Sequence, residues 1–335
     1  MAKPNLTFFC ELASDALIAL FADQSVIEDL TGLQAGVSLG IMDLSPERAQ
    51  VVRRLNEAGI PVTAWQLLPK EQGYWFNAGN AMQAARRYGE FKVWVEEHGL
   101  RFAALGLDLE TDIRDTEALS TGGWSALGNM LARLCHFERM RRAQVEYNLL
   151  VAQMHSDGYP VESYVLPPIL DERRAGSTLL RRLGGLVDVA TDREVPMLYS
   201  SFFRPCGAGL LWSYASEAQA VAVGSTGGGV TVAGADQVPS LDWNELSRDL
   251  CLADRWVGNI YVFSLEGCVR QGFLGRMKEF DWDRPFALPV GSAAQIGLLR
   301  RVLCTALWLS AHPLTTVLAA AVVLRMFSRR RRHLR

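Results

Sequence analysis

Histidine is scarce in this chain, with 5 among 335 residues, and none of them ends a strand that the hydrophobic pattern predicts. This argues against a zinc or two-metal hydrolase and against a Ser-His-Asp triad, because both need histidine beside the reacting atoms. The 6 cysteines show no CxxC spacing, and several lie in apolar runs. We therefore expect reduced core thiols rather than disulfides or metal ligands.

The chain also lacks a strong excess of one charge and a nucleotide-binding motif. Its formal net charge is -2, which gives no general attraction to nucleic acid. No G-x-G-x-x-G follows a predicted strand, and the glycine-rich stretch 224–229 has no P-loop lysine, so we interpret it as a flexible loop. The apolar run Leu6 to Leu12 is too short for a secretion signal and contains Glu11. We therefore expect the body of the protein in the cytoplasm.

Short runs rich in Val, Leu, Phe and Tyr alternate with helix-period stretches, a pattern typical of βαβ units and a parallel sheet. A (β/α)8 TIM barrel uses about 250 residues, which leaves room for an appendage. We therefore predict an α/β chain with one such barrel over residues 1–285; an open doubly wound sheet is the alternative. The predicted strands are Leu6 to Leu12, Gly36 to Asp43, Pro61 to Leu68, Phe102 to Glu110, Val161 to Leu166, Pro196 to Phe202, Ala220 to Gly224 and Asn259 to Glu266.

Return helices follow these runs. One begins at Ser45, which offers an N-cap, with proline in the first turn. Its apolar stripe is Val51, Val52 and Leu55, and we expect Arg48 on its polar face. The stretch from 113 to 158 is longer than one crossover helix requires, so we expect two helices there, split near 120–125.

Acidic side chains gather at the predicted strand ends, where barrel enzymes place their reacting groups. Asp108 and Glu110 are two residues apart in one strand, so both should point into the barrel. Two crowded carboxyls cannot both ionise easily, so one pKa should rise enough for general-acid work. The structural alternative is a helix cap or an ion pair with Arg114. The residues that we expect to bind substrate are Glu11, Asp43, Trp65, Gln66, Tyr74, Trp75, Asn77 and Glu266.

Aromatic residues near the same strand ends suit sugars, whose C–H faces pack on aromatic rings while their hydroxyls bind acids and amides. Tyr74 and Trp75, in a polar loop, are the best candidates. A second enzyme class remains open, because Glu11, Glu266 and the Asp108–Glu110 pair could instead hold Mg2+ through oxygen ligands. That arrangement would suit a lyase or a phosphotransfer enzyme.

The stretch Gly106-Leu107-Asp108-Leu109-Glu110 resembles the end of the D-x-x-D-x-D-x-E signature of chitinase-like family 18 glycoside hydrolases. Met197-Leu198-Tyr199 resembles that family's M-x-Y-D. The resemblance implies that Glu110 protonates the glycosidic oxygen, Asp108 orients the substrate's acetamido group, and Tyr199 supports the intermediate. It implies hydrolysis of a glycan or glycoconjugate without a cofactor.

The chain departs from the family pattern at four positions, one of which is Glu266 on the eighth predicted strand, where the family usually has a tryptophan. Ala103 and Gly106 replace the two earlier aspartates of the signature, and Ser200 replaces the aspartate after the tyrosine. The resemblance is therefore compatible with a relative that binds glycans without cleaving them.

The C-terminal part contains 23 residues, from Val302 to Leu324, without Asp, Glu, Lys or Arg, enough to span a bilayer core of about 30 Å. Arginines flank it on both sides, which conflicts with a simple single span. We predict a linker at 286–301, a transmembrane or re-entrant segment at 302–324 and a basic tail at 325–335 that attracts anionic lipid. The protein would then be membrane-associated with its barrel in the cytoplasm. A helix packed on the barrel is the alternative.

Overall fold

The computed structural model describes residues 3–122, 124–234 and 238–314. Its 8 strands are all parallel and follow the order β6-β5-β4-β3-β2-β1-β8-β7. A bridge between Met197 and Ala222 brings the two edges together, so the sheet nearly closes into a barrel. The predicted (β/α)8 barrel is thus confirmed. The strands are β1 (Asn5–Cys10), β2 (Gly36–Ile41), β3 (Val62–Gln66), β4 (Ala104–Leu109), β5 (Val161–Val165), β6 (Arg193–Pro196), β7 (Val221–Gly224) and β8 (Asn259–Phe263).

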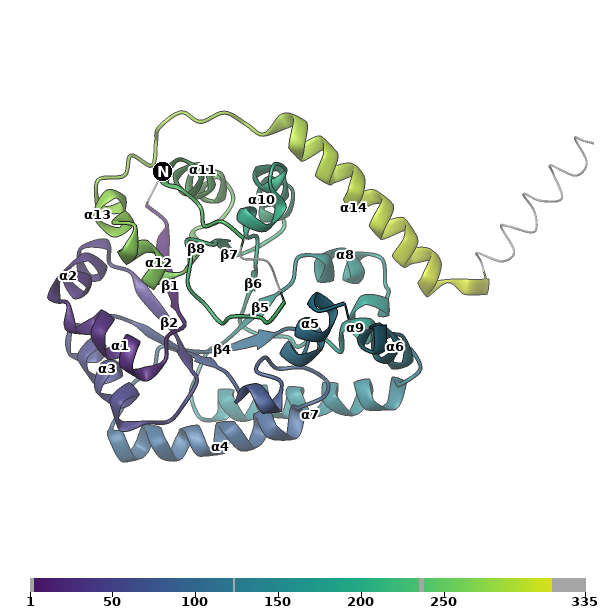
Figure 1. The fold of residues 1–335 in the computed structure, drawn as a ribbon, viewed down its shortest axis with the longest axis horizontal. Coiled ribbons are helices and arrows are strands. Elements are labelled where there is room, and N and C mark those ends of the chain that lie inside the picture. The colour runs from purple at the N-terminus through teal and green to yellow at the C-terminus, as the bar shows by residue number, and fades with distance from the viewer. Residues whose placement is uncertain (1–2, 123, 235–237, 315–335) are drawn as a thin grey trace, which may run out of the picture.

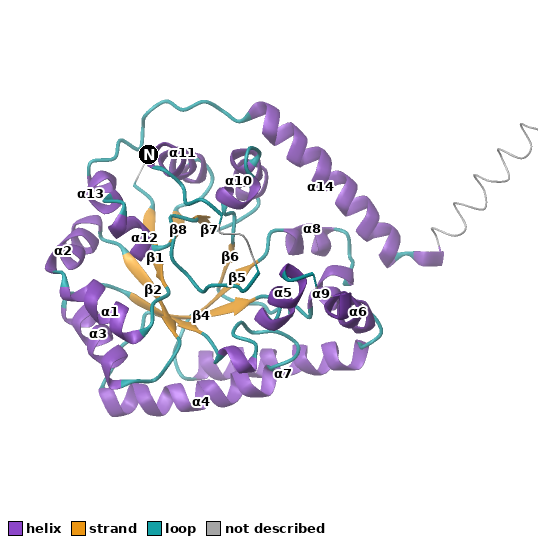
Figure 2. Cartoon of the chain, in the orientation of Figure 1, coloured by secondary structure: helices purple, strands orange, loops and turns teal. Residues whose placement is uncertain are grey.

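Helices surround the strands (Figure 2). The β4–β5 crossover contains three helices, α5 to α7, rather than the expected two. The helices are α1 (Ser14–Ala22), α2 (Gln24–Leu33), α3 (Pro46–Glu57), η1 (Lys70–Gln72), α4 (Ala81–His98), α5 (Ile113–Ser120), α6 (Trp124–Arg133), α7 (Phe137–Ser156), α8 (Pro168–Arg174), α9 (Leu179–Gly184), η2 (Ser200–Phe203), α10 (Gly207–Ala215), α11 (Trp243–Asp254), α12 (Leu265–Arg270), α13 (Phe273–Lys278) and α14 (Val290–Ala311).

The sixth strand lies earlier than its apolar residues predict. It covers Arg193–Pro196, and the apolar residues that follow leave the sheet and enter η2. Charged residues fit in this strand because each has a partner: Arg193 binds Glu162 at 2.8 Å, and Glu194 binds Arg173 at 2.9 Å.

Helix α3 begins as predicted, with the Ser45 hydroxyl oxygen accepting a hydrogen bond from the Arg48 backbone N–H at 3.2 Å. The expectation that Arg48 lies on the polar face is wrong, because its side chain is fully buried. Its guanidinium donates to the carbonyls of Gly40 at 2.8 Å and Leu12 at 3.0 Å. It also pairs with Asp43 at 2.9 Å, so its charge is neutralised inside the protein.

Alternation along the strands creates two separate cores. In β4, Leu105, Leu107 and Leu109 pack beneath the helices, whereas Asp108 belongs to the opposite face. Aromatic rings fill the barrel interior; the centroid of Phe9 lies 4.7 Å from that of Tyr164. A Cβ on Gly106 would lie 2.4 Å from the Tyr164 hydroxyl, so glycine at this position makes room for the ring. The buried interior residues are Phe9, Trp65, Leu67, Tyr74, Trp75, Ile113, Tyr164, Val195, Met197, Ala220, Ala222 and Tyr261.

All 6 cysteines are free thiols, as expected. Cys10, Cys251 and Cys268 are buried, but Cys135 is exposed, so the expected core location does not hold for every one.

Helix α14 packs along α10 and α8 (Figure 1), so most of the expected linker is helical. Arg300 forms ion pairs with Asp171 at 2.7 Å and Glu217 at 3.0 Å, and its guanidinium lies 3.7 Å from the Tyr214 ring centroid. The predicted membrane segment begins inside this helix. Its remainder, 315–324, and the basic tail 325–335 lie outside the described residues. Within the described ranges, no helix is both long and apolar enough to cross a bilayer.

Candidate active site

Four carboxyl groups occupy the end of the barrel where the strands finish. Glu11 follows β1, Asp108 and Glu110 end β4, and Glu266 lies in the first turn of α12 after β8. Asp108, Glu266 and Glu11 are only 2%, 5% and 6% exposed, whereas Glu110 is partly exposed. Across the described chain, no lysine or arginine forms an ion pair with any of the four. Burial therefore favours their protonated forms.

Asp108 and Glu110 lie close enough for each carboxyl to influence the pKa of the other, as the two-residue spacing predicts. Asp108 Oδ1 is buried and has no hydrogen-bond partner, which disfavours the charged form of this carboxyl. Burial and the charge of Glu110 raise the pKa of Asp108, and burial raises the pKa of Glu110 to about 7. Trp65 Nε1 donates to Asp108 Oδ2 at 3.1 Å and fixes the orientation of that carboxyl.

The structural alternative for this pair does not hold. Arg114 binds Asp112, with Nε 2.9 Å from Oδ1, and the carbonyl of Glu71 at 2.9 Å. Asp112 also accepts a hydrogen bond from the Arg114 backbone N–H at 3.0 Å and caps α5. Glu110 is therefore neither the cap of α5 nor the partner of Arg114.

Glu11 and Glu266 accept hydrogen bonds from neutral donors. The Tyr74 hydroxyl donates to Glu11 Oε1 at 2.5 Å, and the Val230 N–H donates to Oε2 at 3.0 Å. Burial outweighs these contacts and raises the pKa of Glu11 to about 7. The Gly229 N–H lies 3.3 Å from Glu266 Oε1, and burial raises the pKa of that carboxyl too.

Tyr199 lies beside the carboxyl pair. Burial first, and then the charges of Asp108, Glu110 and Glu11, raise the pKa of its hydroxyl. Its ring centroid is 5.4 Å from that of Phe263, so the two rings form one side of the mouth. Tyr74 and Trp75 are 2% and 9% exposed and pack edge to face at 5.6 Å. They belong to the wall and floor of the mouth rather than to an exposed loop.

Three predicted substrate-binding residues do not join the mouth: two make internal contacts, and the third, Gln66, is buried with no hydrogen-bond partner for its amide. Gln66 alternates with Trp65 and so belongs to the face beneath the helices, where it is 1% exposed. Asn77 stabilises its own loop, donating to the Trp75 carbonyl at 3.0 Å and accepting from the Gly79 N–H at 2.8 Å. Asp43 binds Arg48 and Ser45; despite its partial burial these contacts hold its pKa below the usual range.

The loop after β7 covers the mouth, which the sequence did not reveal. Gly227, Gly228 and Gly229 have φ values of 102°, 95° and 85°, and Val230 and Val232 pack on the aromatic interior. The expectation of a flexible loop after the seventh strand is therefore correct for its position but not for its contacts. Three consecutive glycines were the available signal, because each adopts a conformation that other residues disfavour.

The magnesium alternative assigns metal binding to the same four carboxyls. In the described ranges, no group of three or more His, Cys, Asp or Glu side chains is arranged as metal ligands. The mouth carboxyls face phenol, indole and backbone donors instead.

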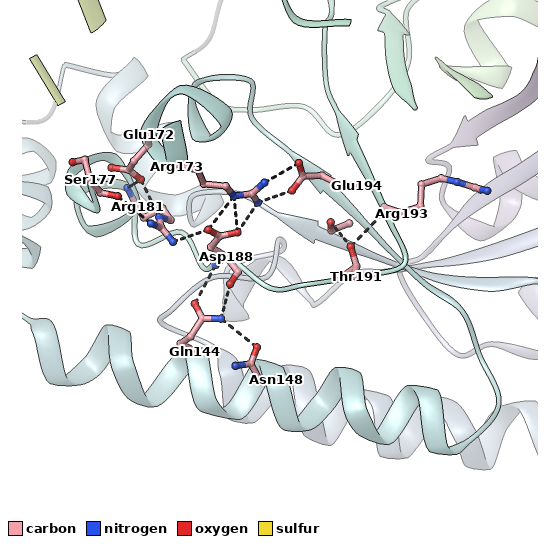
Figure 3. Close-up of polar contacts among 11 residues, drawn as sticks. Gln144, Asn148, Glu172, Arg173, Ser177, Arg181, Asp188, Thr191, Arg193 and Glu194 are labelled. Atoms are coloured by element: carbon pink, nitrogen blue, oxygen red, sulfur yellow. Dashed lines mark hydrogen bonds and ion pairs between the residues drawn. The ribbon is translucent and has the colours of Figure 1, made fainter. Parts of the chain in front are cut away.

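Two cavities lie away from the mouth. One of about 530 Å3 lies beside the start of β6, where Arg173 is held between Asp188 and Glu194 (Figure 3). Its nitrogens contact these acids at 3.0 and 2.9 Å, so the charges there are already paired. The other, of about 270 Å3, lies at the opposite end of the barrel, beside Glu162 and Arg193.

No protein-family model matches the sequence, and no curated protein matches it. Three solved structures are similar in fold. The PgaB (BpsB) glycoside hydrolase domain from Bordetella bronchiseptica is 8% identical, with 82% of this chain and 98% of that chain covered at a TM-score of 0.48. D-allulose 3-epimerase from a Methylomonas species is 11% identical, with coverage of 89% and 98% and a TM-score of 0.39. The HMG-CoA lyase from Brucella melitensis is 12% identical, with coverage of 90% and 100% and a TM-score of 0.38.

Proposed function

We propose that this chain is a glycoside hydrolase-like barrel that acts on a glycan or glycoconjugate. The observation that supports this most directly is the Asp108–Glu110 pair, which has no cationic partner among the described residues and whose pKa values are raised at the mouth of the barrel. A general acid works best when its pKa is near the working pH, and the pKa of Glu110 is raised to about 7.

The residue roles follow from the contacts. Glu110 is partly exposed and donates the proton to the glycosidic oxygen. Asp108 is held by Trp65 and stabilises or orients the group that reacts at the sugar carbon. Tyr199 lies close enough for the charges of Asp108 and Glu110 to raise the pKa of its hydroxyl, and it supports the same intermediate. No cofactor enters this scheme.

A non-catalytic glycan-binding barrel is the second candidate. It is favoured by the departures from the family pattern, because Ala103, Gly106 and Ser200 stand where that family has aspartates. The same acids and rings would then recognise a ligand without cleaving it.

Chromogenic glycosides, including N-acetylhexosaminides, test the hydrolase on the full chain. We expect Glu110→Gln to abolish turnover but retain glycan binding, because the swap removes the proton donor and conserves shape. Glu97→Gln, the same change at an exposed position of α4, is the matched control and should remain active. Turnover by Glu110→Gln contradicts the acid assignment. Glycan binding without turnover in the unmodified chain, as well as in both variants, favours the non-catalytic barrel.

We further propose that the chain contacts anionic lipid through its C-terminal part, with the barrel on the cytoplasmic side. Large apolar side chains on α14 remain exposed, including Leu298 at 57%, Leu299 at 62% and Val302 at 60%. The arginines at the end of the chain would add attraction to anionic headgroups. Cosedimentation of the full chain with anionic and neutral vesicles tests this, and Leu299→Asp should reduce binding. If the same amount of protein sediments with and without vesicles, the proposed lipid contact is contradicted.

A further inference from the structure

Residues 226–233, which we name the mouth strap, are anchored firmly at one end. The Thr226 hydroxyl donates to the Ser264 carbonyl at 2.9 Å and accepts from the Ser264 N–H at 2.9 Å. Gln271 Nε2 donates to the Thr226 carbonyl at 2.7 Å. All three contacts are at least partly buried, so this root is fixed to the end of β8 and to α12.

The middle of the strap presents backbone donors to the acids of the mouth. Successive N–H groups, those of Gly229 and Val230, point at Glu266 and Glu11. A Cβ on Gly228 would lie 2.3 Å from Glu266 Oε1, and one on Gly229 would lie 2.5 Å from Phe263 Cζ. Glycine is therefore required for the strap to come this close.

The strap also presents apolar groups to the rings of the mouth. Val230 and Val232, like Tyr199 and Phe263, pack against the buried cluster of the barrel interior, which includes Trp65 and Tyr74. The strap thus combines N–H donors for carboxyls with an apolar face for aromatic rings. A sugar offers the same combination, with hydroxyl donors and an apolar C–H face.

Among the described residues, the hydrogen bonds at the far end of the strap are exposed. Lys70 Nζ donates to the Thr231 carbonyl at 3.0 Å, and the Ala233 N–H donates to Glu117 Oε1 at 3.2 Å. Exposed contacts of this kind contribute little, because water competes for each partner. The strap can therefore open at this end while its root stays in place.

We propose that the mouth strap occupies the ligand's place, and that the mouth takes a neutral, hydroxyl-rich ring compound that displaces residues 229–232. A polyanion is a poor ligand, because the carboxyl oxygens of Glu11 and Glu266 accept hydrogen bonds and an anionic group would bring them further acceptors instead of donors. The inference uses the proposed function only in taking the mouth as the ligand site, and it holds for a cleaving or a merely binding barrel.

We call the two exposed contacts, of Lys70 with Thr231 and of Glu117 with Ala233, the latch. Hydrogen exchange of the full chain tests whether the latch holds this end of the strap. Lys70→Ala combined with Glu117→Gln should speed exchange at the Gly229 and Val230 amides by roughly three- to tenfold, the factor expected for losing about one hydrogen bond. Lys92→Ala combined with Glu97→Gln makes the same charge changes on α4 and should leave these amides unchanged. Equal exchange in the latch variant and the wild type overturns the opening of this end.

Ligand displacement tests the identity of what enters. Chitotetraose or cellotetraose should speed exchange at 229–232 and slow it around Glu11, and the latch variant should bind more tightly by the factor of its faster exchange. Tetragalacturonate should do neither. Displacement by the polyanion, failure of both neutral sugars to bind the latch variant, or binding without faster strap exchange overturns the inference.

The same measurements on Glu110→Gln separate the two proposals. If this variant loses turnover but shows the same strap displacement, both stand. If it turns over substrate while the strap still responds, the acid assignment fails and the strap inference stands.

Discussion

Glu110→Gln should stabilise the protein at pH 8 and leave its stability nearly unchanged at pH 5. Burial raises the pKa of Glu110 from 4.5 to about 7, so the folded state binds a proton more tightly than the unfolded state. The wild type therefore loses stability as the pH rises from 4.5 through 7, and the loss is complete above 7. Glutamine keeps the shape and stays neutral, so the variant escapes this loss.

The magnitude follows from the shift. A rise from 4.5 to about 7 corresponds to about 3 kcal/mol at about 1.4 kcal/mol per pKa unit. Glu110 is partly exposed and its titration is coupled to that of Asp108, so solvent screening and coupling reduce the amount that belongs to this residue alone. We expect a gain of about 1–2 kcal/mol at pH 8.

Urea unfolding at pH 5 and pH 8 measures this gain. Glu11 has a raised pKa as well, but it is present in both proteins, so the difference between them isolates Glu110. Glu97→Gln should change nothing at either pH. Glu162→Gln should destabilise, because Glu162 accepts from Arg193 at 2.8 Å and from Tyr261 at 2.7 Å. A variant no more stable than the wild type at pH 8, or equally stabilised at both pH values, refutes the reasoning.

Three further predictions concern packing. Gly229→Ala should open the mouth strap, because its φ of 85° and the 2.5 Å approach to Phe263 exclude a methyl group; unchanged exchange at Val230 would contradict this. Arg300→Met should cost about 3 kcal/mol in urea unfolding, because it leaves the fully buried Asp171 without its main cation, and an unchanged midpoint would count against the pairing. A chain ending at 301 should unfold at lower urea than one ending at 314, because it lacks Leu307, which is 1% exposed; equal midpoints would show that this half of α14 is dispensable.

The period of the strands made most of the fold predictable from the sequence. In β4, leucine at every second position separates the helix-facing side from Asp108, and this alternation also places Glu110 beside it. The same rule failed for β6, because it favours apolar runs. Arg193 and Glu194 are stable in a strand only through partners elsewhere in the chain, and single-sequence patterns do not show partners.

The acids of the mouth were predictable, but several of its neighbours were not. Glu11 follows β1 directly, Asp108 lies near the end of β4, and Glu266 lies in the first turn after β8, so topology alone brings them together. Asp43 also follows a strand, but it forms an ion pair with Arg48 and does not join the mouth. Asn77 stabilises its own turn, a local use that position in the sequence does not distinguish from binding. The mouth strap depends on contacts with Lys70 and Glu117, which lie far away along the chain.

The C-terminal stretch shows the limit of composition as a guide. Its lack of charged residues predicted a segment that enters a membrane. The first part of this segment instead lies in α14, where Leu307 is buried. Arg300, which looked like a flanking charge, pairs with Asp171 across 129 positions of sequence. A hydrophobic run alone does not distinguish a helix that packs on a barrel from one that enters a bilayer.

Buried carboxyl groups have different partners at the two ends of the barrel, and this contrast supports the proposed position of the active site. At the start of the strands, Glu162 is 4% exposed and is neutralised by Arg193 and Tyr261. At the other end, Asp108 is 2% exposed and has an indole and a second acid as its neighbours. Burying unpaired carboxyls destabilises a fold, and a barrel closes without them. Stability alone therefore does not explain the arrangement at the mouth, and carboxyls with raised pKa values beside an aromatic wall support the proposed acid catalysis on a sugar.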